Sequence, residues 1–174
     1  MGKNNKYPHE LSRGMNNVVI AISLTEAGKI FTPESRVEIA VEKNNMVYAN
    51  KINDLVVKFI RIEMEGPNQI LVMERLNIFE PRSIEIEIRN AMYNVFVEKL
   101  KELHKHGFCH RDIRHHSGFG GRPFDNVVVT DLGIRLIDVG ISALKELTGE
   151  TLFEHYVNAE LEEAKEYYNF LMEL

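Results

Sequence analysis

The sequence predicts an α+β fold, with a small antiparallel sheet and one helix in its first half and mainly helices in its second half. Short apolar runs separated by turn signals dominate residues 11–74, as expected for antiparallel strands. From residue 83 to residue 106 the apolar positions recur every three or four residues, which indicates a long amphipathic helix. Two apolar runs at 127–130 and 134–137 predict a β-hairpin inside the helical half, with residues 131–133 as its turn.

Length, charge and composition limit the classes of protein to which the chain can belong. Its 174 residues suffice for one domain, or for two small lobes that share a hydrophobic core. A formal net charge of -5 argues against nonspecific nucleic-acid binding. We find no apolar run of spanning length and no signal peptide, so we expect a cytoplasmic protein without a membrane partner. The lone Cys109 excludes a disulfide framework, and we interpret it as a small buried hydrophobe rather than a reactive thiol.

Two short strands are expected near the start of the chain. Residues 1–10 are polar and are expected to be frayed. The apolar run at 18–24 predicts the first strand, residues 25–28 predict a turn, and residues 29–31 predict the second strand. One interpretation of this segment is a trimmed β-hairpin whose Lys29 is a solvated surface lysine.

A helix start follows this hairpin. Thr32 can cap the helix, Pro33 suits its first turn, and Glu34 favours the positive end of the helix dipole. We expect this helix to run to about Asn50. The positions expected to face the core are Val37, Val41 and Met46.

The middle of the chain predicts two more strands and the long helix. Strand-like runs at 55–62 and 70–73 are separated by a strong turn signal at 65–68. Ser83 is a plausible N-cap for the long helix. The apolar stripe of that helix consists of Ile84, Ile88, Met92, Val95, Phe96, Leu100 and Leu103.

The last part of the chain predicts two helices. They span residues 141–147 and 152–174, and residues 148–150 separate them. Both follow the hairpin directly.

Three oxygen-bearing side chains suggest the chemistry. Asp112 lies in a loop after the long helix, Asn126 opens the hairpin, and Asp138 closes it. Phosphoryl transfer needs a carboxylate for the proton of the nucleophile, and oxygen ligands that hold Mg²⁺ on the phosphates. Asp125 is the second choice as a metal ligand if the register differs by one.

These residues resemble the catalytic core of the protein-kinase superfamily. His110-Arg111-Asp112 matches the H-R-D motif, Asn126 matches its metal-binding Asn, and Asp138-Val139-Gly140 matches D-F-G. Taken alone, either tripeptide would be read as a chance turn. The resemblance implies a single domain, 1–174, with a minimal bilobal kinase-like fold, its N-lobe at 11–74 and a reduced C-lobe at 75–174. It also implies ATP and Mg²⁺ as cofactors, with Asn126 and Asp138 as metal ligands.

The resemblance also implies a nucleotide site in the first half. Leu11, Gly14 and Val19 fall in register with the glycine-rich segment, although Ser12 and Asn17 stand where glycines are usual. The full set of implied nucleotide-binding residues is Gly14, Val19, Ala27, Lys29, Glu42, Met73, Glu74 and Leu76.

Several of these assignments keep an alternative. Ala27-Gly28-Lys29 is similar to the A-x-K of the family, but Lys29 can also be a solvated surface lysine. Its implied partner is Glu42, with Glu38 one turn earlier as the fallback. Met73 lies at the back of the implied pocket or is ordinary core filler. The backbone of residues 74–76 would bind an adenine edge.

In the catalytic segment, the resemblance implies that Asp112 orients the acceptor hydroxyl and takes its proton late in transfer. Arg114 would neutralise charge on the transferred phosphoryl group. The main departure is the spacing: Asn126 follows Asp112 by fourteen positions, whereas the family motif has about five. The added loop within 113–125 is basic, aromatic and glycine-rich; it can donate N–H groups, bind substrate or be an ordinary surface loop. His115-His116 lacks partners at zinc-ligand spacing.

Downstream of Gly140 the chain has no long activation segment and no A-P-E motif. It therefore resembles the miniature kinases found among bacterial and phage proteins, which also suggests delivery into a host cytosol. We expect an ATP- and Mg²⁺-dependent phosphotransferase acting on protein Ser/Thr, active without loop phosphorylation or switched on by a protein partner. The alternatives are a kinase of a small hydroxylated molecule and a catalytically weak kinase-like module that binds nucleotide or protein.

Overall fold

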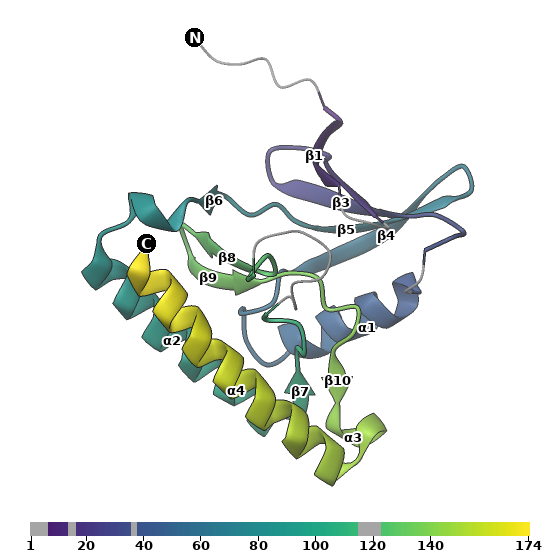
Figure 1. The fold of residues 1–174 in the computed structure, drawn as a ribbon. Helices are drawn as coiled ribbons and strands as arrows, with labels where there is room; N and C mark the ends of the chain where they lie inside the picture. The colour runs from purple at the N-terminus through teal and green to yellow at the C-terminus, as the bar shows by residue number, and fades with distance from the viewer. Residues whose placement is uncertain (1–6, 14–16, 36–37, 115–122) are drawn as a thin grey trace.

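The computed structural model describes residues 7–13, 17–35, 38–114 and 123–174. Within them it shows an α+β protein, as the sequence predicts: a five-stranded antiparallel sheet, two smaller sheets and four α-helices (Figure 1). Among these residues, no helix combines the length and the apolar character needed to cross a membrane.

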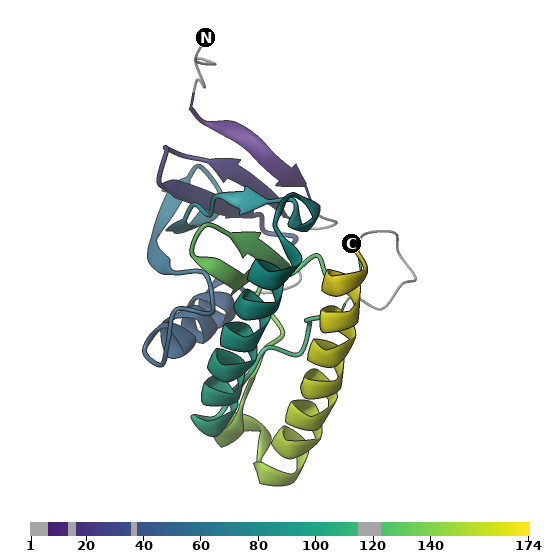
Figure 2. The same cartoon turned by 90° about the vertical axis from the view of Figure 1, so that its left-hand side faces the viewer.

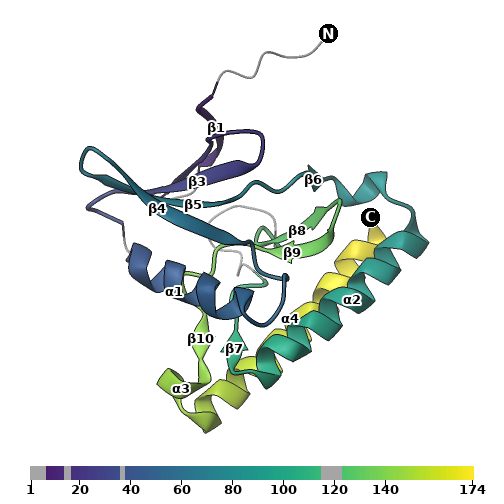
Figure 3. The ribbon, with the colours of Figure 1, turned by 180° about the vertical axis from the view of Figure 1, so that it is seen from behind.

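The large sheet has the strand order β1-β2-β3-β5-β4, and every neighbouring pair is antiparallel. Helix α1 (Ile39–Asn50) lies beneath this sheet and contacts β4 and β5 (Figures 1 and 3). The strands are β1 (His9–Arg13), β2 (Val18–Ala21), β3 (Glu26–Phe31), β4 (Phe59–Glu65) and β5 (Asn68–Glu74).

The second half is built on two long helices that pack side by side, α2 (Ile86–Lys105) and α4 (Glu150–Glu173) (Figure 2). Two small sheets connect them to the rest of the molecule, with orders β6-β8-β9 and β10-β7. The remaining elements are β6 (Ile78–Phe79), the 3-10 turn η1 (Pro81–Ser83), β7 (Phe108–Cys109), β8 (Val127–Thr130), β9 (Gly133–Leu136), β10 (Ala143–Leu144) and α3 (Lys145–Thr148).

One hydrophobic cluster joins the two halves. It contains Leu71 of the large sheet, Met46 of α1, Leu100 of α2, Leu136 of β9 and Tyr167 of α4, all almost fully buried. Because these residues come from every major element, the sheet and the long helices share one core.

The predicted turn at residues 25–28 is wrong. The chain turns three residues earlier, where the Ser23 side-chain oxygen accepts hydrogen bonds from the Thr25 and Glu26 N–H groups. Strand β3 therefore already begins at Glu26. Gly28 lies inside this strand. A glycine fits there because a Cβ at this position would meet the Ile70 side chain at 2.7 Å. The first residues also differ from expectation, since His9 and Glu10 belong to β1 rather than to a frayed end.

Helix α1 begins at Ile39, seven residues after the predicted Thr32 cap. The Ser35 hydroxyl accepts a hydrogen bond from the Thr32 N–H, and the Ser35 N–H donates to the Thr32 carbonyl, so these residues form a turn. Val41 is 44% exposed, and Val37 lies outside the described residues. The buried face instead carries Ile39, Glu42, Asn45, Met46 and Ala49.

The predicted strand at 55–62 is displaced toward the C-terminus, since β4 spans Phe59–Glu65. Strand β4 begins only at Phe59. The Leu136 N–H donates to the Leu55 carbonyl, and the Val57 N–H donates to the Leu136 carbonyl. The start of this apolar run therefore pairs with β9 of the β8–β9 hairpin, not with the large sheet.

Three predictions about the helices of the second half are wrong. Ser83 is not the N-cap of α2; its hydroxyl donates to the Glu80 carbonyl in the preceding turn. Residues 141–147 are not one helix, because Ala143 and Leu144 pair with Cys109 and Phe108 as β10 and β7. Helix α4 then starts at Glu150, inside the predicted break.

The predicted apolar stripe of α2 mixes two faces. Phe96, Leu100 and Leu103 are buried, whereas Ile88 and Val95 are 47% and 49% exposed. The helix therefore contacts the core along a narrower line than the apolar spacing alone indicates.

Truncation on the two faces of α2 should have very different effects. Leu100→Ala is expected to lower the free energy of unfolding by about 2–5 kcal/mol, because it leaves a cavity at a fully buried position. Val95→Ala, the matched control, should change it by about 0.5 kcal/mol or less. Urea unfolding followed by circular dichroism measures both, and equal effects would contradict the assignment of the two faces.

Candidate active site

A buried lysine lies at the centre of the candidate site. Lys29 comes from β3 and is 6% exposed, and its Nζ lies 2.9 Å from both carboxylate oxygens of Glu42 on α1. The same Nζ lies 2.9 Å from Oδ1 of Asp138, which follows β9. Glu42, not the exposed Glu38, is thus the partner of Lys29, and Lys29 is not a surface lysine.

The charges of this group depend on one another. Burial would lower the pKa of Lys29, but the negative charges of Glu42 and Asp138 outweigh burial and hold the pKa above its ordinary value. Burial raises the pKa of Glu42; Lys29 opposes that rise, and Asp138 adds to it. Lys29 is therefore a fixed cation, held on the sheet by a carboxylate from α1.

A second pair joins Asp112 and Asn126. The Asn126 Nδ2 donates to the backbone oxygen of Asp112 at 3.0 Å and to its Oδ2 at 2.9 Å. The fourteen-residue separation in sequence thus does not keep these two side chains apart. Both bonds are made by Nδ2. The Asn126 Oδ1 accepts no hydrogen bond from the part of the chain that the structure describes.

Ile137 connects the two groups of residues. Its N–H donates to the Asn126 carbonyl at 3.0 Å, and its carbonyl lies 2.9 Å from the His110 Nε2. Asp138 is the next residue in the chain. Asp112, Asn126 and Asp138 therefore lie on hydrogen-bonded neighbouring segments.

Two site residues have left-handed backbone conformations, Arg111 with φ 69° and Asp138 with φ 58°. Residues other than glycine seldom adopt this region, and their presence there requires support from the surroundings. At Asp138 the ion pair with Lys29 is one such support.

At Arg111 the support comes from Glu160 of α4, which is 1% exposed. One Glu160 oxygen accepts from the Arg111 N–H at 2.5 Å, and the other lies 2.6 Å from the His104 Nε2. Burial would raise the pKa of Glu160, but the hydrogen bond and charge of His104, with His110 nearby, bring it below its ordinary value. Glu160 therefore fixes the loop that carries Asp112.

The same cluster contains Cys109. Ligand atoms of His104, Cys109 and Glu160 lie within 4.8 Å of one another, as in a metal site. However, the separation of 2.6 Å between His104 and Glu160 is a hydrogen-bond distance, shorter than the roughly 3.3 Å between two ligands of one zinc ion. Burial raises the pKa of the Cys109 thiol, so it stays neutral and packs as the buried hydrophobe that the sequence predicts.

Arg114 is directed toward α4. Its Nη1 lies 2.6 Å from Oε2 of Glu166, and its N–H donates to Glu163. The predicted catalytic arginine is therefore already engaged in an ion pair, although its side chain is 42% exposed.

Four of the eight predicted nucleotide-binding residues share one face of the large sheet. Val19 is opposite Lys29, and Ala27 is opposite Met73. Cross-strand partners and alternate residues of a strand lie on the same face, so these four side chains line the face on which α1 packs. Gly14 lies outside the described residues.

The end of β5 is held at Glu74. Its N–H donates to the Lys58 carbonyl, and its side chain accepts from the Lys58 N–H and pairs with Arg135. Two residues later, the Leu76 N–H has no acceptor among the described residues. This N–H is thus available to a ligand.

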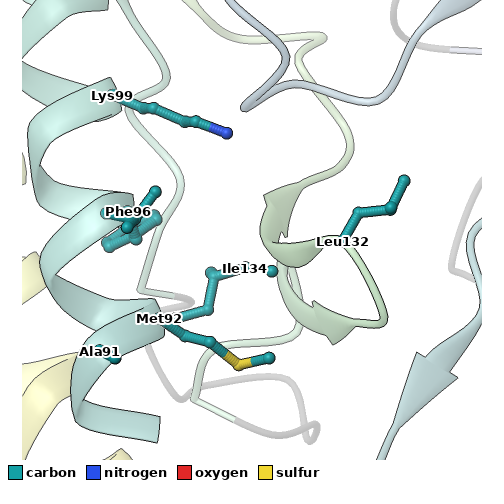
Figure 4. Close-up of a pocket in the computed structure, with 8 residues that line it drawn as sticks. Ala91, Met92, Phe96, Lys99, Leu132 and Ile134 are labelled. Atoms are coloured by element: carbon teal, nitrogen blue, oxygen red, sulfur yellow. The ribbon is translucent and has the colours of Figure 1, made fainter. Parts of the chain in front are cut away.

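An apolar groove of about 310 Å³ lies elsewhere, between α2 and the β8–β9 hairpin (Figure 4). In it, Met92 and Phe96 of α2 lie opposite Ile134 of β9. Its one charged lining residue, Lys99, pairs with Asp54 at 2.5 Å. None of the residues of the candidate site lines this groove, so we do not place the chemistry there.

Comparison of the sequence with protein-family models and with curated proteins identifies no relative. The sequence matches no protein-family model, and no curated protein shows significant similarity to it. The functional argument therefore depends on the geometry of the site.

Glu160→Gln should destabilise the protein in a pH-dependent way. At pH 7 we expect a loss of about 3–5 kcal/mol in the free energy of unfolding, because one partner of a buried hydrogen-bonded pair is removed. Since folding lowers the pKa of Glu160 from 4.5, its contribution is fully present above that pH and is lost as the pH falls through the folded-state pKa. The difference from wild type should therefore shrink toward pH 3.

Urea unfolding at several pH values checks this expectation. The control is Glu162→Gln on the same helix, whose side chain is 68% exposed and which should change stability by about 0.5 kcal/mol or less. A pH-independent loss in Glu160→Gln would show that its carboxylate is not ionised in the folded protein.

Proposed function

We propose that the protein is an ATP- and Mg²⁺-dependent phosphotransferase with a minimal bilobal kinase-like fold. In this proposal residues 11–74 form the N-lobe and residues 75–174 a reduced C-lobe. One observation carries the proposal: the buried Lys29 bridges Glu42 and Asp138, beside the hydrogen-bonded pair of Asp112 and Asn126. Phosphoryl transfer requires this combination of a fixed cation, metal-ligand oxygens and a carboxylate near the nucleophile.

The nucleotide would bind against the sheet face that carries Lys29. The ammonium group would contact the phosphates, since its charge is fixed by Glu42 whether or not Asp138 stays bound to it. Val19 and Ala27 provide apolar contact for a base, and Met73 closes the back of that space. The available N–H of Leu76 fits an acceptor on the edge of a purine ring.

The oxygen donors fit magnesium. Asn126 Oδ1 is an amide oxygen without a hydrogen bond from the described residues, and the Asp138 side chain is 49% exposed. Both are hard ligands of the type that Mg²⁺ prefers. When bound, the cation would neutralise charge on the phosphates; the role of the chain is to hold these two oxygens in place.

In the proposed reaction, an acceptor hydroxyl oxygen forms a bond to the γ-phosphorus while the bond from that phosphorus to the β–γ bridging oxygen breaks. The products are a phosphomonoester and ADP. Asp112 orients the hydroxyl and takes its proton late in transfer. Asn126 fixes the Asp112 side chain through its Nδ2, and Glu160 fixes the Asp112 loop through Arg111. Arg114 would reach the phosphoryl group only after leaving Glu166.

Two acceptor classes are considered. Protein serine or threonine is the acceptor that the kinase resemblance favours. A small hydroxylated molecule is favoured by a different observation: only residues 141–149 separate the Asp138 segment from α4, which leaves little chain there to hold a peptide. A nucleotide-binding module without transfer is the third possible result of the tests below.

Asp112→Asn should separate binding from transfer. We expect phosphoryl transfer to fall by about 10²–10⁴-fold, because the amide cannot take the hydroxyl proton, while ATP affinity changes by less than about twofold. The control is Asp131→Asn in the exposed hairpin turn. The assay follows labelled phosphate from [γ-³²P]ATP in Mg²⁺, with dephosphorylated casein or a mixture of sugars and amino alcohols as acceptor.

The location of the label decides between the acceptor classes. Label on protein supports a Ser/Thr protein kinase, and turnover only with the small hydroxylated compounds supports a small-molecule kinase. Thermal stabilisation by ATP without transfer to any acceptor would overturn the enzyme assignment in favour of a binding module.

Asp138→Ala should remove the dependence of ATP binding on magnesium. Wild-type protein is expected to bind ATP more tightly with Mg²⁺ than with EDTA, and the variant should lose most of that difference because one metal ligand is gone. Isothermal titration of both proteins under both conditions measures this. An unchanged Mg²⁺ effect in the variant would exclude Asp138 as a ligand.

A further inference from the structure

Helix α1 contacts the candidate site through two side chains, not one. Glu42 binds Lys29, and Asn45 lies almost one turn later on the same buried face. Asn45 is 5% exposed, and its Nδ2 donates to the Val139 carbonyl at 2.8 Å. This bond joins residues 94 positions apart in sequence.

The Val139 carbonyl belongs to the peptide unit that links Val139 to Gly140, and Val139 directly follows Asp138 in the chain. Asp138 has a left-handed backbone conformation, which only its surroundings can maintain. The Ser142 N–H also donates to the Val139 carbonyl, at 3.2 Å, so this oxygen has two donors. The backbone on the C-terminal side of Asp138 is thus fixed by hydrogen bonds, while its side chain is oriented by Lys29.

A polar side chain in this position has an energetic cost that packing alone does not explain. The buried face of α1 also carries Ile39, Met46 and Ala49, and an apolar residue could fill the space of Asn45. A buried amide is tolerated only when it is hydrogen-bonded, and its partner is the carbonyl beside Asp138.

We propose that Asn45 is a positioning residue that sets the orientation of Asp138 toward the divalent cation by holding the Val139 carbonyl. This inference rests on the proposed function and deepens it. Glu42 and Asn45 make α1 a single support for both Lys29 and Asp138. A displacement of α1 breaks both contacts together, so the phosphate-binding and cation-binding parts of the site assemble as one unit.

Asn50, at the end of the same helix, offers a matched control. Its Nδ2 also donates to backbone carbonyls, those of Val56 and Val57, and its Oδ1 accepts from the Phe59 N–H. These bonds hold residues 56–59, and none of them goes to residues 138–142. Asn50→Leu therefore removes comparable hydrogen bonds from α1 while leaving the bond between Asn45 and the Val139 carbonyl in place.

The test uses the full chain and two readouts. Isothermal titration with ATP over a series of Mg²⁺ concentrations gives the Mg²⁺ concentration for half-maximal enhancement of ATP binding. Asn45→Leu should raise that concentration about tenfold, as expected for loss of a group that orients a metal ligand, and should change ATP affinity in EDTA by less than about twofold. Amide hydrogen exchange should be faster at residues 138–142 in this variant. Asn50→Leu should change neither quantity.

Each outcome is decisive. If wild-type protein shows Mg²⁺-enhanced ATP binding and Asn45→Leu keeps the same Mg²⁺ dependence, the inference is overturned and the proposed function stands. If wild-type protein binds no ATP with Mg²⁺, both are overturned. Should Asn45→Leu fail to fold, Asn45→Ala replaces it; this variant has no side-chain donor and adds no charge, and the same tenfold shift is expected.

Discussion

The structure of the site depends on one positive charge held between two carboxylates. Lys29 is buried, and a buried ammonium group is stable only where opposite charges and hydrogen bonds replace the lost water. Glu42 supplies both of its oxygens from α1, and Asp138 supplies one from the end of the hairpin. Strand β3, helix α1 and the end of the β8–β9 hairpin must therefore take fixed relative positions for this charge to be buried.

The surrounding fold provides those positions. The β2-β3-β5 ladder sets the face on which Lys29 lies, and the pairing of Leu55 and Val57 with Leu136 ties the segment after α1 to the hairpin. On the other side, α4 holds the Asp112 loop through Glu160. The long helices thus support the proposed catalytic loop, and α1 supports the proposed cation site.

The elements that the sequence predicts well are those with local signals. The Glu65-Gly66-Pro67-Asn68 turn and the hairpin at residues 127–137 are marked by turn residues between apolar runs, and the structure contains both hairpins. The sequence predicts the start of α1 seven residues too early, because Thr32-Pro33-Glu34 has the composition of a helix start. In the structure, Ser35 closes a separate turn there. Local composition cannot distinguish these two arrangements.

The same distinction applies to the site. Asp112, Asn126 and Asp138 belong to recognisable short patterns, and the kinase resemblance implies the pair of Lys29 and Glu42. Glu160 and Asn45 have no such signal: one is among several glutamates of α4, and the other is a single amide on an amphipathic helix. Their importance arises only from what packs against them in three dimensions.

The hydrogen bonds between Asn126 and Asp112 have a consequence for how this chain can diverge. Lengthening the interval between them from about five to fourteen positions adds only about 0.9 kcal/mol of loop-closure entropy, which one or two hydrogen bonds can offset. Insertions at this point therefore cost little stability. Under the proposed function, acceptor preference can change within these residues while the atoms proposed to carry out the reaction keep their places.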